Sequence, residues 1–183
     1  PSNLGELYIS TPASGGGVDI EVFRVGLEDS VRHVVRLPGT LRLLVIDPAG
    51  VRAAALTDQG VIRFGPRDGN PQGTVSALGL PARDIAFATD GTLFVLQETA
   101  LIAIDPSGVR RWSIQLVDGR RVLAGKRAIV LDGTERLIAV DPVTGALDEL
   151  GVGGTVQDLA VSPDGTKIAV LSDARRAVTF TLP

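Results

Sequence analysis

The sequence predicts an all-β fold, a β-propeller of about five four-stranded blade units. Three observations lead to this expectation. Short segments alternate apolar and polar residues and are bounded by Gly, Pro and Asp. Third strands are expected to begin near residues 21, 61, 101, 137 and 177, at intervals of 40, 40, 36 and 40 residues. No segment keeps the apolar period of a helix.

The expected units cover residues 1–40, 41–81, 82–116, 117–154 and 155–183 of a single domain. The alternation predicts four strands in each of the three middle units. In the second unit they cover 41–47, 51–56, 61–64 and 74–78, and in the third 84–88, 93–96, 101–104 and 110–116. In the fourth unit they cover 121–124, 128–131, 137–140 and 146–150. The first unit should supply three strands, at 6–10, 18–25 and 31–37. The last should also supply three, at 155–161, 167–171 and 177–182.

Turn residues separate these strands. The first and second strands are joined by Asp-Pro-Ala-Gly (47–50), Thr-Asp-Gly (89–91) and Ser-Pro-Asp-Gly (162–165). The third and fourth are joined by Asp-Pro-Ser-Gly (105–108) and Asp-Pro-Val-Thr-Gly (141–145). Pro presets φ, Gly accepts a positive φ, and Asp bonds the local backbone, so these carboxylates are expected to stabilise turns.

The terminal units are expected to be incomplete. Both offer a second and a third strand, so they cannot merge into one blade. Two arrangements stay open: five slim blades, two of which lack a strand, or a segment of a larger propeller. The second is favoured.

Composition narrows the function classes. A net charge of −3 argues against a nucleic-acid partner, which needs a basic face. The chain contains no Cys, which excludes disulfides and thiolate metal sites. No apolar run approaches the ~18–20 residues of a membrane span. We therefore expect neither a nucleic-acid partner nor a membrane span in this chain.

Two motifs resemble repeats of bacterial β-propellers. Residues 137–145, Leu-Ile-Ala-Val-Asp-Pro-Val-Thr-Gly, look like a quinoprotein-like blade, and residues 103–108 followed by Trp112 are a shorter relative. Residues 161–170 resemble the Ser-Pro-Asp-Gly start of YVTN-like and TolB-like blades. The resemblance implies that Trp112 packs between blades. It also implies an extracytoplasmic location, periplasmic or at the cell surface, since such propellers include scaffold proteins and assembly lipoproteins.

The residues that could support catalysis are few. His33 is the sole histidine, and its strand position indicates a packed side chain. No Gly-x-Ser-x-Gly elbow is present, and the Gly-rich segment 151–154 precedes a strand, where a phosphate loop needs a helix. We expect no catalytic residue, metal ligand or cofactor.

The loops between second and third strands are the remaining candidates, because binding residues concentrate on loops of rigid scaffolds. In propellers these loops share one end with the links between blades. The candidate partner-binding residues are Glu98, Glu135, Arg136, Asp173, Arg175 and Arg176. Solvated turns have the same composition. The preferred hypothesis is a non-catalytic scaffold that binds a protein partner, and the alternative is a lactonase-like hydrolase with a metal in the central channel.

Overall fold

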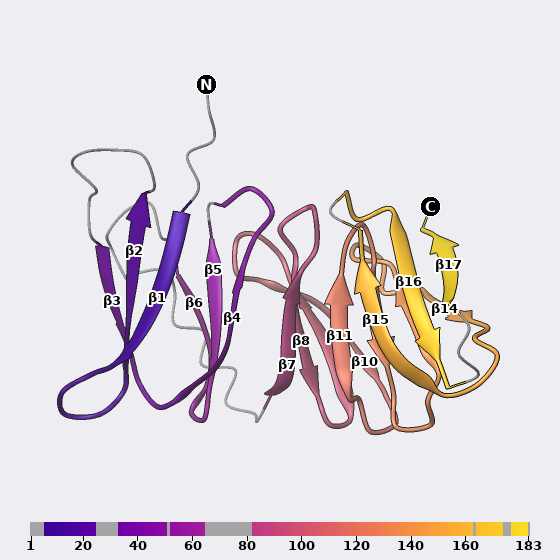
Figure 1. Ribbon diagram of the computed structural model, residues 1–183, viewed down its shortest axis with the longest axis horizontal. Helices are drawn as coiled ribbons and strands as arrows, with labels where there is room; N and C mark the ends of the chain where they lie inside the picture. Colours follow the sequence, from indigo (N-terminus) through magenta and orange to yellow (C-terminus); the bar gives the residue numbers. More distant parts are fainter. Residues whose placement is uncertain are drawn as a thin grey trace. The chain divides into compact units, whose positions relative to one another are not determined.

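The computed structural model describes residues 6–24, 33–50, 52–64, 82–162, 164–173 and 177–182. In these ranges the chain forms strands and no helix, and consecutive strands pair into five separate antiparallel sheets (Figure 1). The chain divides into two compact units, residues 1–81 and 82–183, which are described separately. The expected all-β class is confirmed. That the five sheets form a single domain stays a prediction.

The first unit contains two three-stranded sheets. One has the order β1 (Glu6–Pro12), β2 (Val18–Arg24) and β3 (His33–Leu37). The other has the order β4 (Leu41–Ile46), β5 (Ala53–Thr57) and β6 (Gly60–Phe64). Alternate residues of the two sheets share one core: Val18, Ile20, Val35, Leu37, Ala53, Ala55, Ile62 and Phe64. The predicted strand 74–78 lies outside the described residues, as does the side chain of His33.

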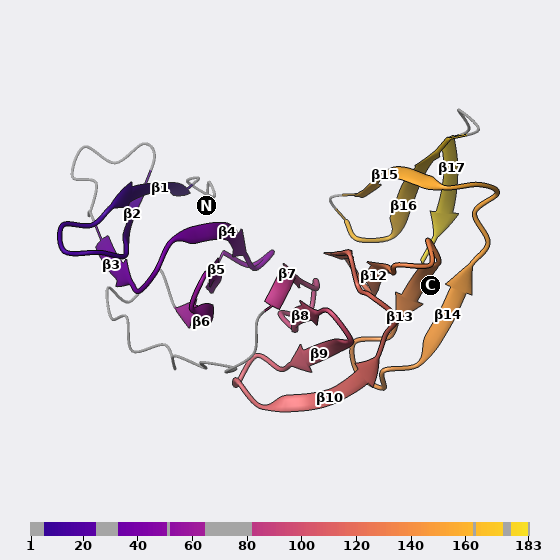
Figure 2. The ribbon, with the colours of Figure 1, turned by 90° about the horizontal axis from the view of Figure 1, so that it is seen from below.

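The second unit contains three sheets that lie side by side (Figure 2). The first has four strands, β7 (Ala82–Phe87), β8 (Leu93–Gln97), β9 (Ala100–Ile104) and β10 (Arg110–Gln115). The second also has four, β11 (Arg121–Ala124), β12 (Ala128–Leu131), β13 (Leu137–Val140) and β14 (Leu147–Leu150). The third has three, β15 (Val156–Val161), β16 (Lys167–Ser172) and β17 (Ala177–Thr181).

The strands agree closely with the sequence prediction, and β11, β12 and β13 agree to the residue. Differences arise at turns. Strand β14 begins at Leu147, one residue late, because the Ala146 carbonyl accepts the Asp141 N–H at 2.9 Å and closes the turn. Strand β1 is longer than expected because its pairing with β2 continues to Pro12 opposite Val18.

Apolar faces join the sheets of the second unit. One cluster lies between the sheet β7–β10 and the sheet β11–β14, and it includes Ala86, Phe94, Leu96, Leu101, Ala103, Val122, Ala128, Val130, Ile138 and Val140. A second cluster joins β11–β14 to β15–β17 and includes Ile129, Leu137, Ala139, Leu159, Ile168, Val170 and Leu182. The central strands β12 and β13 of the middle sheet are therefore covered on both faces by the neighbouring sheets, whereas the edge strand β14 is largely exposed.

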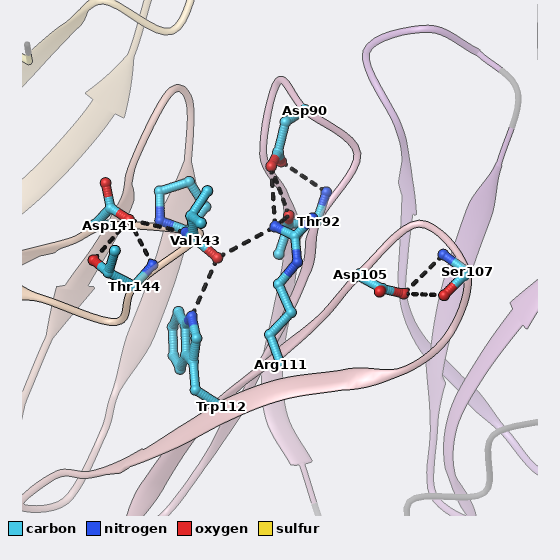
Figure 3. Close-up of polar contacts among 10 residues, drawn as sticks. Asp90, Thr92, Asp105, Ser107, Arg111, Trp112, Asp141, Val143 and Thr144 are labelled. Atoms are coloured by element: carbon cyan, nitrogen blue, oxygen red, sulfur yellow. Dashed lines mark hydrogen bonds and ion pairs between the residues drawn. The ribbon is translucent and has the colours of Figure 1, made fainter.

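The turn aspartates bond the backbone of their own turns, as predicted. Asp105 Oδ1 accepts the N–H of Ser107 at 2.8 Å (Figure 3), and it also accepts the N–H of Val109 at 3.0 Å. Asp141 Oδ1 accepts the N–H groups of Val143 and Thr144 at 2.9 and 2.7 Å (Figure 3). These carboxylates replace the partners that the turn N–H groups would otherwise lack.

A partly buried carboxylate, that of Asp84, connects two sheets near their first strands. Strand β7 has a bulge between Ala82 and Asp84, and an extra residue of this kind redirects a side chain. Asp84 Oδ2 accepts the main-chain N–H of Val122, in β11, at 2.9 Å, while Oδ1 accepts the N–H of Ile85 at 2.9 Å. Burial raises the pKa of Asp84, although both hydrogen bonds oppose this.

Trp112 packs between the same two sheets, as the resemblance implied (Figure 3). Its indole Nε1 donates to the Pro142 carbonyl at 3.2 Å, and its ring lies 5.8 Å from that of Phe94. Arg111 Nη1 donates to Thr92 Oγ1 at 2.9 Å, and it also reaches the Pro142 carbonyl at 3.4 Å. Strand β10 thus bonds the turn that precedes β14, in the next sheet.

We expect Gly145→Ala to destabilise the fold. Gly145 has a φ of 74°, which costs an L-residue roughly 1–2 kcal/mol. An added Cβ would also lie 3.2 Å from Trp112 Cδ2 and displace the ring. The urea midpoint, followed by circular dichroism, should fall, and the emission of the single Trp should shift. Gly151→Ala is the matched control, because nothing lies within 4 Å of its added Cβ. Equal midpoints for the two variants would contradict this account.

Asp164 provides a pH test of the turn chemistry. The Ser162 hydroxyl and the Thr166 N–H and hydroxyl lower the pKa of Asp164 to about 2. The resulting stability is present above the unfolded pKa of about 3.9 and is lost as pH falls through the folded value. We expect a ¹³C NMR titration to give this pKa, and Ser162→Ala to raise it. Ser107→Ala, which affects Asp105, should leave the pKa of Asp164 unchanged. An ordinary pKa in the parent chain would refute the geometry.

Candidate functional site

Charged side chains gather where loops and inter-sheet links of the second unit meet. The loop between β8 and β9 contacts the link between β10 and β11, since Gly119 N–H donates to the Glu98 carbonyl at 2.8 Å. The loop between β12 and β13 joins them, since Gly133 N–H donates to the Val117 carbonyl at 2.9 Å. Hence these loops and links share one end of the unit, as expected for a propeller.

Five residues at this end form a continuous set of ion pairs, called here the charged rim: Arg83, Glu98, Asp118, Arg120 and Glu135. Arg83 pairs with Asp118 and, at 3.3 Å, with Glu98 Oε1. Arg120 lies 3.9 Å from Asp118 Oδ2 and 4.0 Å from Glu135 Oε1. The charges alternate along the set, so neighbouring side chains attract each other.

The rim is exposed, although its backbone is held in place. The Glu98 and Asp118 side chains are 69% and 47% exposed, which leaves both open to a partner. Arg83 and Arg120 also donate to the carbonyls of Gly119 and Gly133, each at 3.2 Å. Main-chain contacts therefore fix the arginines, while the acidic side chains extend into solvent.

Two rim residues have an unusual backbone conformation. Asp118 and Glu135 have φ angles of 51° and 64°. They are the two non-glycine residues with a positive φ in the described ranges. Such conformations are disfavoured by sterics and often occur at functional sites. The chain thus accepts local strain in two of the three segments that carry the acidic rim residues, the segments of Asp118 and Glu135.

Asp132 shapes the loop beneath Glu135. Its carboxylate is fully buried and accepts the N–H groups of Thr134 and Arg136, both at 3.0 Å. Burial alone would raise the pKa of Asp132, but hydrogen bonds from Thr134 and Arg136 outweigh it and lower the pKa. Asp132 therefore stays ionised at neutral pH and positions the loop.

The structure separates the predicted partner-binding residues. Glu98 and Glu135 belong to the rim. Arg136 adjoins it, but its Nη2 is paired with Asp132 at 2.7 Å. Asp173 lies in another loop and accepts the Thr155 N–H at 3.2 Å. Arg175 and Arg176 lie outside the described residues.

The sequence prediction missed three rim residues, because they are not in hairpin loops. Arg83 lies at the bulge of β7, whereas Asp118 and Arg120 lie in the link before β11. The charged run Asp118-Gly119-Arg120-Arg121 was the available signal. The links between blades were expected at this end, but the predicted binding residues all lay in the hairpin loops.

Among the described residues, no three His, Cys, Asp or Glu side chains gather as metal ligands would. The same part of the chain has no helix long and apolar enough to cross a bilayer.

Comparisons with known proteins give the fold. Neither a family model nor a curated protein matches the sequence. Among solved structures, the dihydro-heme d1 dehydrogenase NirN in complex with DHE aligns with a TM-score of 0.66 and 16% identity over 96% of this chain and 41% of that chain. The WD40 domain of SCAP from fission yeast aligns with a TM-score of 0.61 and 9% identity, over 79% of this chain and 39% of that chain. BBS1N in complex with ARL6DN aligns with a TM-score of 0.68 and 12% identity, over 96% of this chain and 64% of that chain.

The chain spans less than two thirds of each of these structures. At these identities the likeness concerns the fold and not the activity. It agrees with the five antiparallel sheets and with the sequence motifs. The chain has a β-propeller repeat fold.

Proposed function

We propose that this chain is a non-catalytic binding module that contacts a protein partner through the charged rim. The observation that carries the proposal is the rim itself: exposed charges of both signs, placed on a main chain fixed by hydrogen bonds. A pre-organised surface loses little conformational entropy when a partner binds. Alternating charges favour a partner with the complementary pattern, which gives specificity and speeds association.

Stability does not account well for the rim. Exposed ion pairs contribute little to folding, because solvent screens them. The strained φ angles of Asp118 and Glu135 act against stability. A binding role explains why the acidic side chains project outward. One of the similar structures, BBS1N, is itself bound to a protein, ARL6DN, which supports this class of function.

An extracytoplasmic location stays a prediction from the sequence resemblance. Fractionation of the producing cells would test it, and the binding proposal does not depend on it.

The proposal predicts a site-specific crosslink. A photo-crosslinking amino acid at Glu98 or Glu135, introduced in the producing cells, should give an adduct with a second polypeptide. The same group at Ser107 or Val143 is the matched control, because these residues lie in turns at the opposite end of their hairpins. Adducts of equal yield at all four positions, or none at the rim, would refute the proposal.

Charge reversal tests the chemistry of the contact. With the crosslinked partner purified, we expect Glu98→Lys with Glu135→Lys to weaken binding about tenfold or more at low salt, and less at high salt, where charges are screened. Circular dichroism should be unchanged, since these side chains are exposed. Unaltered affinity at low salt would contradict a charge-directed contact.

A further inference from the structure

Strand β14 forms the free edge of a four-stranded sheet. It pairs with β13, and no other strand of the described chain pairs with it (Figure 2). The Asp141 N–H donates to the Ala146 carbonyl at 2.9 Å, which makes these residues a hydrogen-bonded antiparallel pair. Such pairs alternate along a ladder, so Asp148 bonds toward β13. The N–H and C=O groups of Leu147 and Glu149 therefore point outward, where an added strand would meet them.

This edge lacks most of the features that prevent strand addition. Edge strands are commonly protected by a bulge, a proline or a lysine. The edge strand β10 of the other four-stranded sheet has a bulge between Arg110 and Trp112. Strand β14, in contrast, pairs without a register shift and contains no proline, lysine or glycine. Its main chain is therefore suited to pairing with a further strand.

The side chains of β14 specify which kind of strand would fit. Leu147, which is 50% exposed, lies on one face of the sheet with Glu149. Asp148 lies on the other face with Leu150, and its side chain stays 63% exposed although Arg127 pairs with it at 2.6 Å. The edge thus reads apolar, acidic, acidic, apolar. Cross-strand neighbours stabilise a sheet when both are apolar or when their charges are opposite.

We propose that β14 binds an extended segment of a partner polypeptide by strand addition, and that this segment has two successive basic residues between two apolar residues. Main-chain bonds to Leu147 and Glu149 hold the segment. Its basic residues pair with Asp148 and Glu149, and its apolar residues cover Leu147 and Leu150. The surface uses none of the five residues of the charged rim, so the proposal does not rest on the function proposed above.

The charges favour a different polypeptide over a second copy of this chain. Pairing β14 with the β14 of another copy would place acidic side chains opposite acidic ones, which destabilises a sheet. Among the described strands, only β10 has two basic residues in succession, Arg110 and Arg111. Arg111 already donates to Thr92 Oγ1 at 2.9 Å, and the bulge before Trp112 interrupts the ladder. Neither strand of a second copy therefore fits β14 without rearrangement.

Peptide binding to the chain tests the proposal. The probe is a short, capped and fluorescently labelled peptide with the core Val-Arg-Lys-Val, titrated at low salt and followed by fluorescence anisotropy. We expect saturable binding, and binding about tenfold or more weaker when Glu-Glu replaces Arg-Lys. In the complex, hydrogen exchange at the amides of Leu147 and Glu149 should slow about tenfold or more, because they gain partners. The amide of Asp148, which already bonds toward β13, should change less.

Variants of the peptide and of the chain separate the two parts of the contact. In an antiparallel pair, the second and fourth core residues of the peptide face Glu149 and Leu147, so N-methylation of both should abolish binding. N-methylation of the third, whose N–H points away, should be tolerated. Asp148→Asn with Glu149→Gln should weaken binding about tenfold or more, with an unchanged circular dichroism spectrum. Asp158→Asn is the matched control, because it also neutralises an exposed strand carboxylate that pairs with an arginine.

Several outcomes would overturn the proposal. They are the absence of saturable binding, equal affinity for the acidic peptide, binding that survives N-methylation of both facing residues, and an unchanged affinity of the Asp148→Asn, Glu149→Gln variant. Self-association of the chain that Arg110→Glu abolishes would also overturn it, because a second copy would then be the occupant of β14.

Discussion

The central strands of these sheets carry apolar side chains on both faces. Covering only one face of such a sheet would leave the apolar side chains of the other face in water. In β9 and β13 every residue is buried, so alternation between a core side and a solvent side is lost. Removing apolar surface from water contributes about 25 cal/mol per Å². A sheet of four short strands is too small to cover its own faces. The chain therefore has to place sheet against sheet, and the spacing of the repeats follows from this requirement.

Polar groups are arranged around that packing. Where sheets approach closely, an unpaired N–H would be costly, because water cannot reach it. Asp84 satisfies such a group on Val122, and the Pro142 carbonyl accepts from both Trp112 and Arg111. These bonds fix how far one sheet is displaced relative to the next, which apolar contact alone leaves less defined. Directional contacts thus specify the arrangement that apolar burial favours.

The sequence was sufficient for the strands and turns of the second unit because both depend on local chemistry. Short apolar or alternating segments bounded by Gly, Pro and Asp mark strands, and Asp141 followed by Gly145 specifies one turn whatever surrounds it. The rim could not be derived in the same way. Arg83 and Glu98 are neighbours because β7 pairs with β8, with Ala82 opposite Gln97 beside the bulge, whereas a main-chain bond from Gly119 to Glu98 brings the link that carries Asp118 to the same place. No spacing in the sequence encodes the approach of the link to the loop, so the sequence prediction included Glu98 and Glu135 but missed their partners.

The two ends of the second unit use their carboxylates differently. At the turn end, Asp105, Asp141 and Asp164 are committed to main-chain N–H groups, and the pKa of each is lowered by these bonds and by hydroxyl donors. At the end that carries the rim, Asp132 likewise accepts main-chain N–H groups. Glu98, Asp118 and Glu135 instead pair with arginine side chains. A side chain that supports no turn can exchange its partner for one on another molecule without opening the fold. Recognition is therefore expected where carboxylates are not used to build the scaffold.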